Sequence, residues 1–396
     1  MKISGIICEY NPFHTGHEYL IKEAKKRSDA VVCVMSGHFT QRGEAAIADK
    51  FVRAKTALLG GADLVLELPF PFSAASASYF AAAGVKLLSM VGADRLVFGS
   101  ESGEITRLLT LADHLLSADF EKKKEKMMAS EGSALAHFGA LLGERERLLP
   151  NDILAVEYLR AIKKEGLPME AVAVSRVGDG FLQKELGDSP YASATALRQS
   201  LYLGDLAAME TYMPKYSLAE LKEALTREEA PVTTENAARA ILGFFRLIAP
   251  EALSEIAGLG NGLEQRICAS AKESRDLAEF LQKCATKRYT DAAIRRAILA
   301  AMTGVTYADL DRGAVYTTVL GANATGRALL ASLRKKKLPL LTKPSDVEVL
   351  CLAFPEKKDA ILRQAALSES ADALYSLCLP RVTEAGKYLR SGAVML

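Results

Sequence analysis

The chain has 396 residues, of which 49% are hydrophobic and 25% charged, and its formal net charge is +2. This composition is that of a soluble globular protein, and the length exceeds what one hydrophobic core usually serves, so we expect two domains. No uninterrupted apolar run approaches the ~20 residues that span a bilayer, and the amino terminus lacks an export signal. We therefore expect a cytoplasmic protein without membrane contact, and nothing in the sequence indicates a protein partner.

The charges are distributed unevenly. Residues 1–220 hold 25 Lys and Arg against 28 Asp and Glu, whereas residues 221–396 hold 25 against 20. The basic excess is concentrated in residues 287–343, which hold 11 basic residues against three acidic ones, while all five histidines precede residue 138. This asymmetry predicts chemistry in the first half and polyanion binding in the second. The six cysteines show no C-x-x-C spacing, and we interpret them as buried, reduced thiols.

The first twenty residues predict a strand, a tight loop and a helix. An apolar run, residues 3–8, passes through residues 9–13 to His14-Thr15-Gly16-His17, where helical spacing begins. The amino end of a helix that follows a buried parallel strand presents free N–H groups and a positive dipole to phosphate. The two histidines share one face of the first turn, and Gly16 leaves room for a nucleotide. We interpret this motif as an ATP phosphate grip.

Two other interpretations of the motif stay open. The spacing also arises by chance in a small fraction of chains of this length. Two histidines at helical spacing can also bind zinc, although zinc usually takes an i, i+4 pair with a third ligand, and none is evident nearby.

Further strands and helices alternate along the first half of the chain. Apolar runs predict strands at 30–36, 62–68, 95–99 and 171–174, helical spacing predicts helices at 47–59 and 73–90, and residues 104–165 are typical of a helical insertion. This alternation predicts a Rossmann-like parallel sheet whose ligands bind at the carboxyl ends of the strands. We place this α/β domain at residues 1–215.

Several polar side chains would follow these strands. Arg176 follows the strand at 171–174, and a helix beginning at Ser193-Ala194-Thr195 carries Arg198, so these groups suit a triphosphate. A surface salt bridge is the alternative for the two arginines. His38 either approaches the site or is solvated, and Asp63 and Glu67 are either structural or position a substrate. Asn151-Asp152 predicts a helix cap.

Helical spacing dominates beyond about residue 215, and the strand pattern fades. Residues 227–231, Arg-Glu-Glu-Ala-Pro, are typical of a linker or long loop. We therefore expect a mainly α-helical, basic second domain at residues 216–396.

Several longer strings resemble one known family. His14-x-Gly16-His17 and Ser193-x-Thr195-x-x-Arg198 are similar to motifs of the nucleotidylyltransferase superfamily, which is related to class I aminoacyl-tRNA synthetases. More specifically, five strings resemble the bacterial tRNA(Met) cytidine acetate ligases, and these strings are residues 9–17, 34–37 with 41–44, 98–103, 151–154 and 287–290. Cys8 departs from the aliphatic residue expected in the first strand, but a free cysteine packs as a small hydrophobe.

The resemblance implies a ligase reaction. Acetate and ATP would form acetyl-adenylate and pyrophosphate, and the acetyl group would pass to N4 of the wobble cytidine of elongator tRNA(Met), without acetyl-CoA. The resemblance implies ATP contacts along the first strand, loop and helix and at three later positions: Ile7, Cys8, Glu9, Tyr10, Asn11, Pro12, Phe13, His14, Thr15, Gly16, His17, Glu18, Tyr19, Leu20, Gly103, Asn151 and Arg176.

The chemistry assigns roles to a few of these residues. His14 and His17 would donate hydrogen bonds to the phosphates as pyrophosphate departs, and would be the catalytic residues. Ser193, Thr195 and Arg198 would complete the ATP site. Mg²⁺ would bridge the phosphates, held mostly by them and by water, so that no residue is assigned to the metal.

The basic stretch supplies the candidates for tRNA contact. Phosphate contacts would come from nine residues, with a solvated basic face as the alternative: Lys287, Arg288, Arg295, Arg296, Arg327, Arg334, Lys335, Lys336 and Lys337.

Two rival functions remain at this point. An adenylyltransferase acting on a phosphorylated small molecule would explain the histidines but not the basic half. A non-catalytic RNA-binding protein that merely holds ATP would explain the basic half without any reaction.

Overall fold

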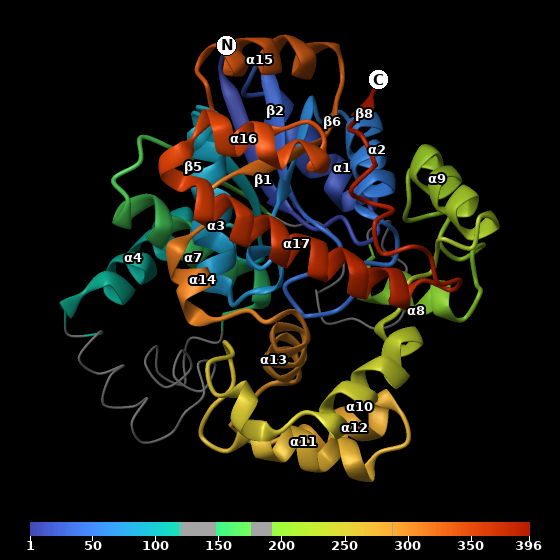
Figure 1. Cartoon of the computed structure of the whole chain (residues 1–396). Coiled ribbons are helices and arrows are strands. Elements are labelled where there is room, and N and C mark those ends of the chain that lie inside the picture. Colours follow the sequence, from blue (N-terminus) through green and yellow to red (C-terminus); the bar gives the residue numbers. More distant parts are fainter. Residues whose placement is uncertain (119, 121–147, 176–191, 287) are drawn as a thin grey trace.

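The computed structural model describes residues 1–118, 120, 148–175, 192–286 and 288–396 (Figure 1). Within this part of the chain a single mixed sheet has the strand order β5-β4-β1-β2-β3-β6-β7, with β8 paired to β6. Its strands are β1 (Ile3–Cys8), β2 (Ala30–Ser36), β3 (Leu64–Leu68), β4 (Arg95–Ser100), β5 (Glu170–Ser175), β6 (Thr317–Ala322), β7 (Leu340–Leu341) and β8 (Val394–Met395). The predicted α/β class is therefore confirmed.

Helices lie on both sides of the sheet and below it in Figure 1. Those of the first half are α1 (Thr15–Lys25), α2 (Lys50–Leu59), α3 (Ala77–Met90), α4 (Ile105–Leu116), α7 (Pro150–Lys164), α8 (Ala194–Tyr202) and α9 (Lys215–Thr226). Those of the second half are α10 (Ala238–Leu247), α11 (Leu263–Glu273), α12 (Leu277–Cys284), α13 (Asp291–Thr303), α14 (Tyr307–Arg312), α15 (Ala324–Lys335), α16 (Val347–Ala353) and α17 (Lys358–Cys378).

The order of the parallel strands places a switch point at β1. β1 pairs with β2 on one side and with β4 on the other, and all three run in the same direction. The chain therefore leaves β1 toward β2 and β3, and later returns to the other side of β1 through β4. In open α/β sheets such a reversal creates a crevice outside the carboxyl ends of the strands, where ligands bind. The loop of residues 9–14 occupies this place.

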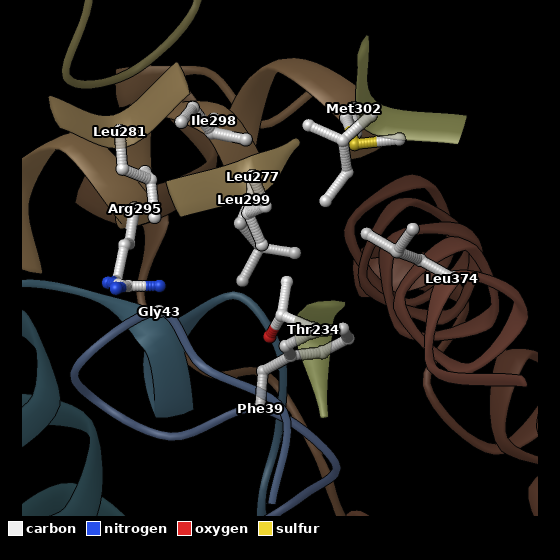
Figure 2. Close-up of a pocket in the computed structure, with 11 residues that line it drawn as sticks. Phe39, Gly43, Thr234, Leu277, Leu281, Arg295, Ile298, Leu299, Met302 and Leu374 are labelled. Atoms are coloured by element: carbon white, nitrogen blue, oxygen red, sulfur yellow. The ribbon is translucent and has the colours of Figure 1, made fainter. Parts of the chain in front are cut away.

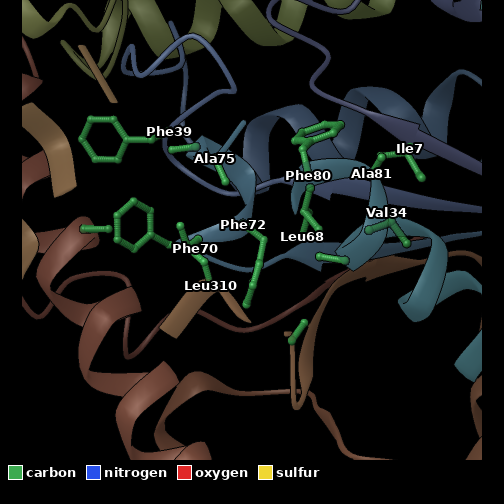
Figure 3. Packing of buried hydrophobic residues seen from close by; sticks show 14 of the residues in the cluster. Ile7, Val34, Phe39, Leu68, Phe70, Phe72, Ala75, Phe80, Ala81 and Leu310 are labelled. Atoms are coloured by element: carbon green, nitrogen blue, oxygen red, sulfur yellow. The ribbon is translucent and has the colours of Figure 1, made fainter. Parts of the chain in front are cut away.

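Alternate side chains of the central strands enter two cores. Ile6 and Cys33 face helices α1 and α2, whereas Ile7 and Val34 face α3 and α7 on the opposite side. The second core continues beyond the sheet, through Phe39, Phe70 and other aromatic side chains, toward the helices of the second half (Figure 3). Burial on both faces explains why the sequence shows these strands as continuous apolar runs.

Glycine allows α3 to approach the sheet closely. A Cβ atom on Gly84 would lie 2.6 Å from Ile7 Cδ1, and one on Gly5 would lie 2.5 Å from Leu88 Cδ2. Real Cβ atoms do not tolerate such distances, so a larger residue at either position would require the Ile7 or Leu88 side chain, or the helix, to shift. Glycine at these two positions thus allows close packing of α3 on the sheet.

The second half of the chain is mainly helical, but it also completes the sheet, which the sequence did not indicate. β6 pairs antiparallel with β3, and both β7 and β8 pair with β6. The interpretation that strands fade after residue 215 is therefore wrong for these segments. β6 was missed because its partner β3 lies far away in the sequence, and β7 and β8 were missed because they have two residues each. The domain boundary at residue 215 stays a prediction.

Residues 104–165 contain α4 and α7 within the described part of the chain, and the helical insertion placed there stays a prediction. α7 packs against α3 and α4 and leads directly into β5, which pairs parallel with β4. α7 is thus a crossover helix between two neighbouring parallel strands, β4 and β5.

Among the helices of the described ranges, none is both long and apolar enough to cross a bilayer.

Candidate active site

The loop after β1 turns sharply because Tyr10 adopts a left-handed conformation, with φ of 49°. Asn11 follows, and its Oδ1 accepts a hydrogen bond from the backbone N–H of Ile47 at 2.8 Å, while the peptide bond to Pro12 is cis. Left-handed backbone is uncommon for a bulky residue and concentrates at functional sites. The loop is thus held by specific contacts and not by regular secondary structure.

His14 and His17 lock the first turn of α1. His14 is the N-cap, where its Nδ1 accepts from Gly16 N at 3.1 Å, and its own backbone N–H donates to His17 Nδ1 at 3.3 Å. The two rings stack with centroids 3.7 Å apart. Because both Nδ1 atoms accept hydrogen bonds, a neutral form of either ring carries its proton on Nε2. Each ring is therefore oriented as an Nε2–H donor, at a helix end that favours anions.

Aromatic side chains support the histidine pair from inside the protein. The buried ring of Tyr10 lies 4.9 Å from that of His17 and 5.0 Å from that of Phe13, and its hydroxyl contacts the Cys33 thiol at 3.4 Å. Ser217 Oγ donates to the carbonyl of Phe13 at 2.8 Å, which ties the loop to α9. These contacts fix the ring of His17 through packing as well as through its hydrogen bond.

Glu9 is a half-buried carboxylate in the same loop. Its carboxylate accepts from the backbone N–H of Gln41 at 2.7 Å. Burial raises the pKa of Glu9, and the Gln41 N–H and the charges of Arg198, Arg42 and Arg53 oppose this rise. The guanidinium groups of Arg198 and Arg53 thus lie near Glu9, and the carboxylates of Glu44 and Asp49 act on the same arginines.

The helix that carries Arg198 contacts the loop directly. Arg198 Nη1 donates to the carbonyl of Asn11 at 2.8 Å and Nη2 contacts Thr195 Oγ1 at 3.3 Å. Ser193 is the N-cap of α8, where its hydroxyl accepts from Ala196 N at 3.1 Å, so the predicted helix start is confirmed. The structure thus brings Arg198 to the histidine turn, while the hydroxyl of Ser193 serves the helix itself.

Gly103 and Asn151 lie beside the turn at the ends of neighbouring elements. The side chain of Glu101 accepts from both Asn151 Nδ2 at 2.5 Å and the backbone N–H of Asp152 at 2.9 Å. In return, the Asp152 carboxylate accepts from Ser100 Oγ and from the backbone of Glu101. Asn151 lies within the first turn of α7 and Leu149 is the N-cap, so the predicted cap at Asn151 is wrong, because Pro150 starts the helix one residue earlier.

Gly103 is required by its conformation and by its neighbour. Its φ is 66°, and a Cβ atom there would lie 2.3 Å from Ser175 Oγ at the end of β5. The carboxyl ends of β4 and β5 therefore meet at this glycine. Arg176 follows Ser175 but lies outside the described residues, and so does Lys287 of the basic stretch.

Comparisons with known proteins agree with this geometry. Residues 1–388 match the family described as HIGH Nucleotidyl Transferase. A protein of Acetivibrio thermocellus named tRNA(Met) cytidine acetate ligase is 34% identical, with 100% of both chains covered, and one of Syntrophomonas wolfei with the same name is 35% identical, covering 96% of this chain and 95% of the other. The chain belongs to the tRNA(Met) cytidine acetate ligase family.

Solved structures of this ligase family have the same fold throughout. The crystal structure of Thermotoga maritima TmcAL bound with alpha-thio ATP is 30% identical, covers 100% of both chains and gives a TM-score of 0.90. The apo form of that protein gives a TM-score of 0.92 with the same identity and coverage. The α/β nucleotidyltransferase fold inferred from the sequence is confirmed.

A buried charged cluster lies behind the site of this family member. His38 Nδ1 contacts Asp372 Oδ1 at 2.6 Å, and Lys50 Nζ contacts both Asp372 at 3.3 Å and Glu67 at 2.8 Å. All four residues are buried. The cluster joins α17 to α2 and to the ends of β2 and β3. The interpretation of His38 as solvated is therefore wrong, and Glu67 has a structural role.

Asp63 is structural as well. Its carboxylate accepts from the backbone N–H of Val31 and from the side chains of Lys25 and Asn323. These contacts lie at the amino end of β3, opposite the histidine turn. Asp63 thus cannot position a substrate at the carboxyl ends of the strands.

The loop after β2 packs against the helices of the second half. An apolar pocket between this loop, α12, α13 and α17 is lined by Phe39, Leu277, Leu299 and Leu374, with the Arg295 guanidinium at its edge (Figure 2). Gly43 has φ of 73°, and a Cβ atom there would lie 2.7 Å from the backbone N of Arg296. Close approach of α13 therefore explains the glycine in the string at 41–44.

The basic candidates do not gather on one surface. Arg295 lies 3.6 Å from Glu44, and Arg296 donates to the carbonyl of Gln41 at 3.0 Å, where burial lowers the pKa of Arg296 to about 10. Arg288 is partly buried nearby, over the ring of Tyr289. In contrast, Arg327 and residues 334–337 are exposed on and after α15, which follows Asn323 at the amino end of β3. The two groups lie at opposite ends of the sheet (Figure 1).

The sequence analysis did not identify Arg53, which is buried and donates to backbone carbonyls before α2, in the loop after β1 and at the end of β2. The signal was present, since Lys50, Arg53, Ala54 and Ala57 follow the i, i+3, i+4, i+7 spacing of a buried helix face, but a charged residue on such a face was not expected.

Among the described residues, no group of three or more His, Cys, Asp or Glu could hold a metal ion.

Proposed function

We propose that this protein activates acetate with ATP and transfers the acetyl group to N4 of the wobble cytidine of elongator tRNA(Met). The observation that supports this most strongly is the stacked His14–His17 pair at the switch point of the sheet, in a chain that matches the acetate ligases over its full length. The name of these relatives supports acetate and tRNA(Met) as substrates, and the ATP analogue bound in the T. maritima structure supports ATP as the nucleotide.

The first step forms a mixed anhydride. A carboxylate oxygen of acetate attacks the α-phosphorus of ATP, a new P–O bond forms, and the bond to the β-phosphate oxygen breaks, so that pyrophosphate leaves and acetyl-adenylate remains. The protein supplies alignment and charge stabilisation rather than a nucleophile. The Nε2–H donors of His14 and His17, the amino end of α1 and the guanidinium of Arg198 would stabilise the departing phosphates.

The second step is acyl transfer to RNA. The exocyclic N4 of cytidine attacks the acetyl carbon, the bond between that carbon and the phosphate oxygen breaks, and N4 loses a proton while AMP leaves. The wobble base must leave the anticodon stack to reach acetyl-adenylate. Lys287, Arg288, Arg295 and Arg296, together with the basic residues on and after α15, are the proposed phosphate contacts.

Mg²⁺ fits this scheme as an ion held by phosphate oxygens and water. The neutral donors and guanidinium groups at the turn are suited to phosphate rather than to a cation, so the protein would leave the ion to the nucleotide. When bound, Mg²⁺ would neutralise charge on the β- and γ-phosphates.

Incubation with unmodified tRNA, ATP and isotopic acetate, followed by mass spectrometry of the nucleosides, tests the function. We expect labelled N4-acetylcytidine only when ATP is present, and no need for acetyl-CoA. Pyrophosphate exchange with a phosphorylated small acceptor, and not with acetate, would favour an adenylyltransferase instead. Binding of tRNA without any acetylated nucleoside would point to an RNA-binding protein.

A further inference from the structure

Arg53 of α2 lies beneath the histidine turn and is only 2% exposed. Its guanidinium donates to four backbone carbonyls: those of Ala48 at 2.9 Å, Glu9 at 2.6 Å and Ser36 at 3.1 Å, and that of Gly37. Glu9 belongs to the loop after β1, whereas Ser36 is the last residue of β2 and Gly37 follows it. One side chain thus joins the carboxyl ends of two neighbouring strands.

This arrangement differs from an ordinary buried ion pair. Within the described part of the chain Arg53 takes part in no salt bridge, and the carboxylates of Asp49 and Glu9 act on it only from a distance. A buried charge without a direct counter-ion is costly, unless its N–H groups are fully used. The planar guanidinium meets this condition because it can satisfy several carbonyls at fixed angles, which a lysine ammonium cannot.

The position of Arg53 connects it to the chemistry. Glu9, whose carbonyl accepts from Arg53, lies five residues before His14. The loop between Glu9 and His14 also contains Asn11, whose Oδ1 accepts from the backbone N–H of Ile47, shortly before α2. The loop that follows Gly37 carries Gln41, whose N–H holds the Glu9 carboxylate. Movement of the Glu9 or Gly37 carbonyl would therefore change both the geometry of the histidine turn and the position of the charged groups beside it.

We infer that Arg53 is a positioning residue: its carbonyl contacts set the distance between the loop after β1 and the loop after β2, and its positive charge increases the affinity of the turn for a triphosphate. The inference rests on the proposed function for its rate measurement, but not for its binding measurement. Geometry and charge are separable, because lysine keeps the charge and loses the planar set of donors.

The test compares Arg53→Lys, Arg53→Met and the wild type in acetate-dependent ATP–pyrophosphate exchange. Each protein is assayed at least about 15 °C below its own melting temperature, so that loss of folded protein does not lower the rate. We expect Arg53→Lys to lower kcat about 10²-fold with KM for ATP nearly unchanged, since misplacement of reacting groups lowers the rate of the chemical step. Arg53→Met should show the same loss and in addition an about tenfold higher KM, since it also removes the charge.

Arg246→Met is the matched control. The Arg246 guanidinium also donates to two backbone carbonyls, those of Ala271 and Ser274, but in the helices of the second half. Its loss should lower the melting temperature and leave kcat and KM unchanged.

Gly37→Ala covers the case in which neither Arg53 variant folds. A Cβ atom there would lie 2.6 Å from Glu67 Oε1, and because Lys50 holds this buried oxygen at 2.8 Å, we expect the Gly37 backbone and the carbonyl that Arg53 contacts to shift. We expect kcat to fall at least about tenfold with KM retained. A wild-type kcat in Arg53→Lys, or in Gly37→Ala where the Arg53 variants do not fold, would overturn the inference.

Binding of a nonhydrolysable ATP analogue separates this inference from the proposed function. If the wild type shows no acetate-dependent exchange, the proposed function fails, but the affinities still test Arg53. Arg53→Met should then bind the analogue about tenfold more weakly than both the wild type and Arg53→Lys. Equal affinities in all three proteins would overturn the role of the charge.

Discussion

The proposed chemistry depends on two residues, His14 and His17, and on the backbone that orients their imidazole rings. Each ring uses Nδ1 to hold the helix end, and Nε2 is the nitrogen that we propose donates to the phosphates. His17→Ala should therefore lower acetate-dependent ATP–pyrophosphate exchange by ~10²–10³-fold, by analogy with other preorganised donors. His114→Ala, at an exposed position on α4, is the control and should retain the full rate. Unchanged exchange in His17→Ala would exclude the proposed role.

His38 should make the folded state sensitive to mild acid. Burial lowers the pKa of His38, although the carboxylate of Asp372 opposes this shift. The unfolded chain therefore binds a proton below about pH 6.5 that the folded protein does not bind, so stability is full above this pH and falls as the pH decreases through it. Melting temperatures between pH 7.5 and 5.5 should fall less steeply for His38→Gln than for the wild type. Parallel curves would contradict this assignment.

Individual site residues were predictable only where a local string identifies them. The histidine pair and the helix start at Ser193 follow from sequence neighbours, whereas Gly103 was implied only by the family resemblance. Arg53 and the Lys50–Asp372 contact could not be predicted in the same way. Lys50 and Asp372 are 322 positions apart in the sequence, and only the tertiary fold brings α17 to the first residue of α2.

At the scale of elements, the amino end of α7 fixes the loop after β4. Asp152 and Glu101 exchange hydrogen bonds across this contact, so that Gly103 and Asn151 are held beside each other. Asp152→Ala should release the loop and weaken binding of an ATP analogue by about tenfold, because three contacts to the loop from Ser100 to Ser102 are lost.

Isothermal calorimetry measures the affinity of each variant for the ATP analogue, and Asp113→Ala is the control. Asp113 also pairs with a helix side chain, Lys163, but on the exposed surface, and its loss should leave nucleotide affinity unchanged. Equal affinity in Asp152→Ala and the wild type would contradict the role of α7.

Element boundaries show why the fold was predicted better in the first half than in the second. Apolar runs between helices indicated β1 to β5 within about two residues of their observed ends, and of these strands β5 is only partly buried. β6 is buried, but it pairs antiparallel with β3, far away in the sequence, so no parallel βαβ unit indicated it. A short strand that reaches its partner from 250 residues away carries no local signal.

At the scale of the whole molecule, the basic residues lie at two ends of the sheet, and a bound tRNA would meet them separately. Lys335, Lys336 and Lys337 are exposed after α15, so their replacement by Gln should reduce the dependence of tRNA binding on salt by a slope of about 2, since each phosphate contact contributes about 0.7 to 0.9. Filter binding at several salt concentrations measures this slope. Lys357→Gln, exposed elsewhere on the surface, should change it little, and an unchanged slope in the triple variant would remove α15 from the interface.

Oxygen tracing tests the central claim most directly, because the route through acetyl-adenylate leaves one acetate oxygen on phosphorus. The protein is incubated with ¹⁸O-labelled acetate, ATP and unmodified tRNA, and the AMP and inorganic phosphates are analysed by mass spectrometry. We expect one ¹⁸O atom in each AMP formed with acetylcytidine, and His17→Ala should form ~10²–10³-fold less labelled AMP in the same time. Label in orthophosphate or pyrophosphate with unlabelled AMP would contradict adenylation at the histidine turn.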